Sequence, residues 1–130
     1  MNLLLDTCTF LFLVSDFERI PANTRQRLAT LPLTVSTLTL WEILIKIGKG
    51  QLRIDTGNQG MAGFWREQCE ALEALVLPVQ PADVLHLPAL PVIHRDPFDR
   101  LLICQAIEHG LALVTPDEHI RQYPVKTIWE

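Results

Sequence analysis

The stretch from residue 94 to residue 118 constrains the fold more than any other, because it joins a helix to a buried strand without a break. Asp96 followed by Pro97 predicts a helix start, with an acidic N-cap and a proline at the first helical position. Gly110 supplies the left-handed residue that ends the helix. The short apolar run Leu111–Val114 then suits a strand buried on both faces. Such a strand belongs inside a covered sheet, so the rest of the chain should supply its neighbours.

Four more short apolar runs predict strands at Asn2–Leu5, Leu33–Ser36, Leu75–Val79 and Val125–Trp129. Helical patterns between them cover Cys8–Val14, which is apolar almost all round and should be buried, then Pro21–Thr30, Thr39–Ile47 and a stretch that begins at Met61. Two short helices are also expected, one capped by Asp83 and closed by Pro88 and one near Glu118–Gln122. This alternation implies a mostly parallel sheet covered on both faces. With 130 residues, the chain is expected to form one α/β domain spanning 1–130.

Charge and cysteine content exclude several kinds of protein. The net charge of −4 argues against a nucleic-acid binder that simply neutralises phosphates, but not against an enzyme that holds phosphate through metal ions. No apolar run approaches the ~18 residues of a membrane span. The start, MNLLLDT, lacks the basic region of a signal peptide. The scattered Cys8, Cys69 and Cys104 lack metal-ligand spacing and are predicted to be reduced core residues of a cytoplasmic protein.

Four acids follow predicted strands or open predicted helices: Asp6, Glu42, Asp99 and Asp117. In open α/β sheets, ligands bind beyond the carboxyl ends of the strands, and these acids should all lie at that edge. Structural roles compete with a functional one. Asp6 could be a turn acid that binds its own backbone, and Asp117 could be the first-turn acid of a short helix. Glu42 could close a capping box with Thr39, or it could pair with Lys46 one turn later.

Asp99 has a serious structural alternative, but a functional role is favoured. With Asp96 as N-cap, it occupies the third helical position, where a carboxylate interacts favourably with the helix dipole. It nevertheless lies on the side of Leu102, Ile103 and Ala106, so it should face inward. An inward carboxylate needs a partner.

Together, the four acids predict a metal-dependent nuclease. Like charges so placed repel unless cations lie between them, and hard divalent ions such as Mg²⁺ take carboxylate and water oxygens. Two such ions about 4 Å apart can activate a water and stabilise the leaving oxygen in phosphodiester cleavage. Thr7, Ser36 and Thr115 lie beside the acids and could orient water or phosphate. His94 could touch phosphate, although a solvated or capping role is favoured, and the other histidines show no paired spacing.

At these residues the chain resembles PIN-domain ribonucleases, specifically the VapC-type toxins of type II toxin–antitoxin systems. The resemblance is carried by LLLDT at 3–7, SxxxLWEIxIK at 36–46, HRDPFDRLLICQA at 94–106 and LVTPDEHI at 113–120. It implies a parallel sheet in the order 3-2-1-4-5 and Mg²⁺- or Mn²⁺-dependent cleavage of RNA. It also implies a homodimer controlled by a cognate antitoxin protein. The family's four acids match Asp6, Glu42, Asp99 and Asp117, and Asp96 belongs to the subgroup's motif.

Three alternatives compete with this resemblance. A phosphoacceptor receiver domain would use Thr115 and Lys126, but it needs an acid pair after strand one, where Thr7 stands, and an Asp after strand three, where residues 79–81 supply none. A haloacid-dehalogenase-type phosphatase needs an acid at the position of Cys8. A PIN-like fold used only for protein binding, without nuclease activity, stays open.

Overall fold

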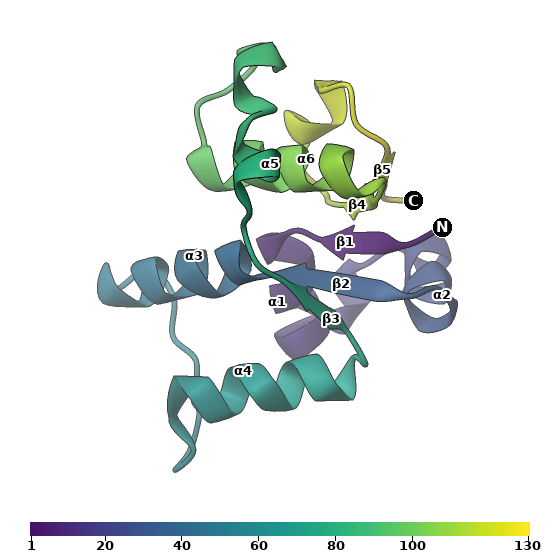
Figure 1. Cartoon of the computed structure of the whole chain (residues 1–130). Helices are drawn as coiled ribbons and strands as arrows, with labels where there is room; N and C mark the ends of the chain where they lie inside the picture. The colour runs from purple at the N-terminus through teal and green to yellow at the C-terminus, as the bar shows by residue number, and fades with distance from the viewer.

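The computed structural model describes all 130 residues. The chain forms a five-stranded sheet covered by helices on both faces (Figure 1). The strands are β1 (Leu3–Leu5), β2 (Leu33–Ser36), β3 (Leu75–Leu77), β4 (Ala112–Val114) and β5 (Thr127–Ile128). The α-helices are α1 (Thr7–Ser15), α2 (Ala22–Thr30), α3 (Thr37–Gly48), α4 (Gly60–Ala71), α5 (Pro81–Val84) and α6 (Pro97–His109). Three single 3₁₀ turns complete the chain: η1 (Phe17–Arg19), η2 (Leu87–Ala89) and η3 (Ile120–Gln122).

All strand pairs are parallel, and the strand order is β3-β2-β1-β4-β5, which confirms the expected fold. In a receiver-type sheet, with the order 2-1-3-4-5, the first strand lies between the second and the third. Here β1 lies between β2 and β4, so the receiver alternative is wrong. The strand order reverses between β1 and β4. Ligands of open parallel sheets bind at such a switch point, beyond the carboxyl ends of the strands.

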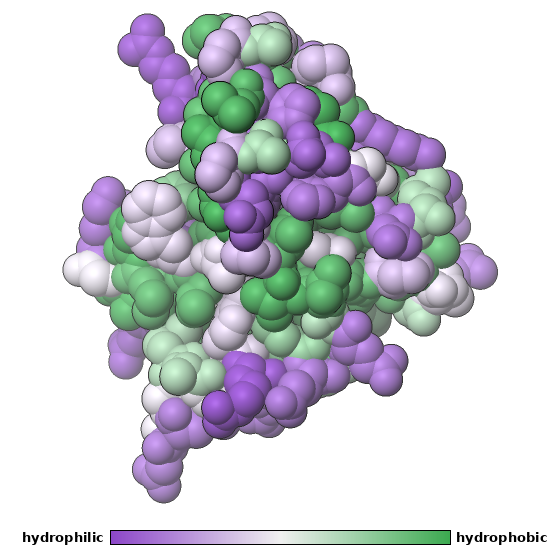
Figure 2. Space-filling model, viewed as in Figure 1, coloured by the Kyte–Doolittle hydropathy of each residue, from purple (hydrophilic) through white to green (hydrophobic).

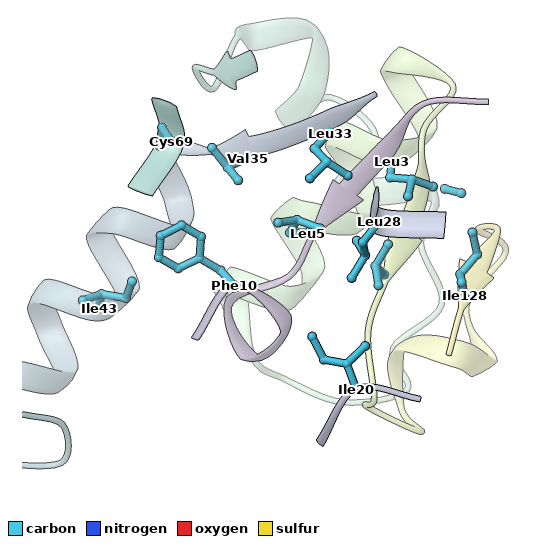
Figure 3. Close-up of a cluster of buried hydrophobic side chains, with 12 residues drawn as sticks. Leu3, Leu5, Phe10, Ile20, Leu28, Leu33, Val35, Ile43, Cys69 and Ile128 are labelled. Carbon is cyan, nitrogen blue, oxygen red and sulfur yellow. The ribbon is translucent and has the colours of Figure 1, made fainter. Parts of the chain in front are cut away.

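The period-two alternation along the strands divides the core into two layers. Leu3 and Leu5 point to one face, where they pack with α1, α2 and α4 (Figure 3). Leu4 points to the opposite face, where it packs with α6. The strand β4 repeats this division, with Ala112 and Val114 on the first side. Helices on both faces therefore bury these central strands completely, as their unbroken apolar runs predict.

Several expectations at the level of elements need correction. The helix α3 begins two residues early, because the Ser36 hydroxyl caps it by accepting the Leu38 N–H at 3.0 Å. Asp83 does not cap a helix closed by Pro88: Gln80 is the N-cap of α5, Asp83 occupies its third position, and Pro88 lies within η2.

Burial also departs from expectation in two places. The second half of α1, from Leu11 to Val14, is only half-buried. Cys69 and Cys104 are buried and free, as expected, whereas Cys8 is exposed, so its assignment to the core is wrong. Cys8 lies in the first turn of α1, on the side that the sheet does not cover. No helix reaches the length and apolar character needed to cross a membrane.

The edge strand β3 stays partly uncovered. Leu75 is 66% exposed and Val76 is also exposed, as is Leu44 on α3. In Figure 2, a band of hydrophobic surface crosses the middle of this face over β2 and β3, between the more hydrophilic surfaces of α4 below and the α5 region above.

Candidate functional site

Asp6 ends β1 and is the N-cap of α1. Its carboxylate accepts the Thr9 N–H at 2.8 Å, and the residue is only 3% exposed. Burial raises the pKa of Asp6 to about 6, against the opposing hydrogen bonds of Thr115 and Thr9 and with a further increase from the charge of Glu42. No basic side chain pairs with it. The turn-acid interpretation is therefore correct for its backbone contact, but it leaves a buried carboxyl without a counter-charge.

Glu42 lies in the second turn of α3 and is 6% exposed. The Thr7 hydroxyl donates to its Oε1 at 2.6 Å, and Lys46 Nζ lies 3.1 Å from its Oε2. Because Thr39 lies inside the helix, the capping-box interpretation is wrong, and the pairing with Lys46 is confirmed. Burial lowers the pKa of Lys46, but the hydrogen bond and charge of Glu42, with smaller contributions from Cys8 and Asp96, outweigh it and raise the pKa.

Asp99 occupies the third position of α6, and the Asp96 carboxylate caps the helix by accepting the Asp99 N–H at 3.0 Å. The Asp99 side chain turns inward, 16% exposed, and its Oδ2 lies 3.1 Å from His94 Nε2. Burial raises the pKa of Asp99 to about 7 despite the hydrogen bond from His94, and the charges of Asp96, Asp6 and Asp117 raise it further. The inward carboxylate and its need for a partner are confirmed.

Asp117 follows β4 and precedes η3. Its Oδ1 accepts the His119 N–H at 2.7 Å and the Ile120 N–H at 3.4 Å, while its own N–H donates to the Thr115 hydroxyl at 3.0 Å. The side chain is 35% exposed. Asp117 therefore has a turn-forming role as well as a place at the sheet edge.

Asp6 and Asp117 follow the carboxyl ends of β1 and β4, Glu42 lies on α3, which begins at the carboxyl end of β2, and Asp99 lies in the first turn of α6. Figure 1 shows how these elements are arranged around the sheet. The charges of Asp6 and Asp117 act on Asp99, and the charge of Glu42 acts on Asp6. Each carboxylate also has a contact within the protein, and no three acid, histidine or cysteine side chains are arranged to hold a metal ion. The donors themselves fit a hard divalent cation. They are oxygens, they share excess negative charge, and buried Asp6 has no basic partner.

The hydroxyl-bearing residues predicted to support the acids divide into two groups. Thr7 donates to the Glu42 carboxylate, and Thr115 accepts the backbone N–H of Asp117 and lowers the pKa of Asp6 through a side-chain hydrogen bond. Ser36 instead serves as the N-cap of α3 and has no contact with an acid.

A set of groups that no sequence pattern predicts holds Asp99 in place. His94 Nδ1 lies 2.8 Å from the Tyr123 hydroxyl, and the His94 ring stacks on His119 with centroids 5.4 Å apart. The Tyr123 hydroxyl also accepts a hydrogen bond from Arg100 Nη1 at 3.0 Å. The favoured solvated or capping role of His94 is wrong, because the ring lies between an acid and a phenol. No spacing pattern indicates this contact, since Tyr123 is 29 positions away.

Comparisons with solved structures agree with the fold. The chain shares its fold with VapBC2 from Rickettsia felis bound to a promoter DNA fragment, at 13% identity and a TM-score of 0.70 with both chains fully covered. It is also similar to DNA-bound VapBC from Salmonella typhimurium, at 17% identity and a TM-score of 0.68, covering 98% of this chain and 97% of that one. VapBC-1 from nontypeable Haemophilus influenzae matches at 19% identity and a TM-score of 0.59, with the same two coverages.

No curated protein matches the sequence. The model of one family, described as the PIN domain, matches residues 3–126, which include all four acids. The chain therefore belongs to the PIN domain family.

Proposed function

We propose that this chain is an endoribonuclease that hydrolyses phosphodiester bonds with the help of Mg²⁺ or Mn²⁺, and that it is the VapC-type toxin of a toxin–antitoxin pair. One observation carries the proposal. Two carboxyls at the switch point of a PIN-domain sheet, Asp6 and Asp99, have pKa values raised to about 6 and about 7. Strongly perturbed acids in such a place are typical of functional sites.

Asp6, Glu42, Asp99 and Asp117 are the residues that would hold the metal. When bound, a divalent ion would activate a water molecule and stabilise the leaving oxygen. The chain's own part is to hold the oxygens in place. Thr7 fixes Glu42, Thr115 fixes the backbone of Asp117, and the His94 ring fixes Asp99.

The proposed protein partners follow from the resemblance and from the structural neighbours, which are VapBC complexes. A cognate antitoxin would inhibit the chain by placing a positively charged side chain in the acidic site, where it would supply the counter-charge that Asp6 lacks. The chain itself is proposed to form a homodimer.

Cleavage of a panel of structured RNAs tests the nuclease proposal. Cleavage should require Mg²⁺ or Mn²⁺, and Asp6→Asn, Asp99→Asn and Asp117→Asn should each lose most of it. Loss of a group that only supports a metal ligand costs about 10–100-fold, so loss of a ligand should cost at least that much.

Asp16→Asn is the matched control, because Asp16 is an exposed carboxylate at the end of α1 that pairs only with Arg19. This variant should cut RNA as the wild type does. Equal cleavage in excess chelator would contradict the metal requirement. A protein that cuts no RNA with either metal would favour the open alternative, a PIN fold that only binds protein.

A further inference from the structure

An aromatic pair, of which Trp41 is exposed and Phe98 half-buried, lies next to two of the four acids. Trp41 directly precedes Glu42 on α3, and Phe98 directly precedes Asp99 on α6. Their rings meet edge to face, with centroids 4.9 Å apart and planes at 73°. Two helices that each carry one acid therefore also carry one half of this pair.

Trp41 differs from the other tryptophans in its exposure. Trp65 and Trp129 are half-buried and pack against Phe10 and Phe12. Trp41 is 54% exposed, although its ring also has an aromatic partner. An edge-to-face contact uses only part of a large ring system, and the remainder of Trp41 is open to solvent. The core does not explain the exposed part of this side chain.

Basic groups accompany the pair. Lys46, on the same helix as Trp41, is 38% exposed and lies close enough to the start of α6 for the charge of Asp96 to act on it. Arg95, next to that cap, is exposed and forms no ion pair. An aromatic face with cations beside it is the combination that binds single-stranded nucleic acid, in which bases stack on rings and phosphates meet basic side chains.

We propose that Trp41, braced by Phe98, is a stacking platform for one unpaired base of the RNA substrate, next to the bond that the acids act on. This inference rests on the proposed nuclease function and adds a substrate requirement to it. The RNA must present an unpaired base at the cleavage site, because a base held within a duplex cannot leave its own stack to reach the ring without an unpairing cost. Arg95 and Lys46 would then contact the flanking phosphates.

The test measures RNA binding, in the Asp117→Asn background to limit cleavage. The probe is a short, fluorescently labelled single-stranded RNA of mixed sequence, compared with the same strand annealed to its complement. Trp41→Ala should weaken binding of the single strand by about 5- to 150-fold, the range for loss of one stacked base. Trp41→Phe should retain most of the affinity, and binding of the duplex should change little in either variant. Quenching of tryptophan emission by the single strand should be largely lost in Trp41→Phe.

Leu44→Ala is the matched control. Leu44 is also exposed, at 45%, and lies on the same helix, about one turn after Trp41. It should bind the single strand like its parent. If Trp41→Ala binds equally well, the inference is overturned. If Trp41→Ala and Leu44→Ala both shift the oligomeric state, with RNA binding falling in step, the face belongs to a second copy instead. A wild-type protein that cuts RNA while Trp41 is dispensable overturns only this inference; a protein that cuts no RNA overturns the proposed function.

Discussion

At the scale of single residues, Asp99 shows two opposing effects on one carboxylate. Its place in the first turn of α6 favours ionisation, through a helix-dipole interaction of about 0.3–1 kcal/mol. Burial and the charges of neighbouring acids nevertheless raise its pKa to about 7. A shift of that size corresponds to a few kcal/mol against the ionised form, on the order of 1.4 kcal/mol for each pKa unit. Burial therefore outweighs the dipole, and ionised Asp99 destabilises the metal-free fold.

The variant Asp99→Asn should therefore melt at a higher temperature than the wild type in chelator at a pH above about 7. The amide oxygen of asparagine can still accept the hydrogen bond from His94, so the change removes mainly the charge. Mn²⁺ should raise the melting temperature of the wild type by mass action, and that of the variant much less. Four thermal melts measure this. If Asp99 were only a helix-dipole acid, the variant would melt lower and Mn²⁺ would move neither protein.

Helical periodicity predicts that Asp99 faces inward, but not what it meets there. Asp99 meets His94, and His94 is held in turn by Tyr123, the residue that ends η3. These contacts form only when distant parts of the chain pack together. Local patterns cannot specify such a contact. The same reason explains Cys8, whose exposure depends on which side of α1 the sheet covers.

At the scale of elements, two contacts join α5 and the turn after it to α6. Asp83, fully buried, accepts the Gln80 N–H at 2.8 Å and lies 2.9 Å from His109 Nε2, with Gln105 Nε2 at 3.4 Å. The second contact is between His86 and Glu108 at 2.8 Å, where both side chains are about a third exposed. The Asp83 carboxylate is buried and interacts with three donor groups, whereas Glu108 is exposed. The Asp83 contact should therefore contribute most of the stability of this junction.

Asp83→Ala should lower the free energy of unfolding by about 1–3 kcal/mol, because it removes the acceptor of the part-buried Gln80 N–H at the start of α5 and the partner of His109 on α6. It also removes one of the two acceptors of the buried Gln105 Nε2, which keeps its hydrogen bond to the Pro78 carbonyl. Glu108→Ala should change it by less than about 1 kcal/mol, as expected for an exposed pair. Urea unfolding of both variants measures the difference. Similar losses for the two variants would contradict the assignment of the junction's stability to Asp83.

Most elements were predictable because their signals are local. The apolar strands, the Asp96 cap and the Gly110 stop, at φ 63°, all follow from neighbouring residues. The errors occur where two local signals compete. Ser36 and Thr39 are both good caps before the same apolar run, and the structure uses Ser36, which is the last paired residue of β2 and directly precedes the helix. The strand order came from the family resemblance, since strand propensity does not determine which strands become neighbours.

At the scale of the whole molecule, acids outnumber basic residues. The chain has 15 acids and 11 Lys and Arg residues, so the net charge of −4 equals the number of acids in the candidate site. The remaining acids and bases are balanced. Glu42 pairs with Lys46, but Asp6 has no basic partner, and the fold holds these acids at one edge of the sheet at a cost in stability that the proposed divalent cation would offset.

That cost should appear as a pH dependence of stability. Asp6 has a folded-state pKa of about 6, raised by burial from an ordinary value of 3.8, so the folded state binds its proton more tightly than the unfolded state does. Stability from this group is therefore present at low pH and is lost as the pH rises from about 4 to about 6, by about 3 kcal/mol at most. Asp6→Asn cannot lose a proton in this range.

In chelator, the free energy of unfolding of Asp6→Asn relative to wild type should thus increase with pH from about 4 to about 7 and then level off. Urea unfolding at a series of pH values measures this difference, in which the titration of the other groups cancels to first order. Asp6→Ser is the control for the lost carboxylate contact to Thr9, since serine also caps helices well and should give the same pH profile. Saturating Mn²⁺ should make the wild type more stable than Asp6→Asn at neutral pH, because only the wild type retains all four acids to bind the ion. A difference that does not vary with pH would show that Asp6 carries no electrostatic strain in the folded protein.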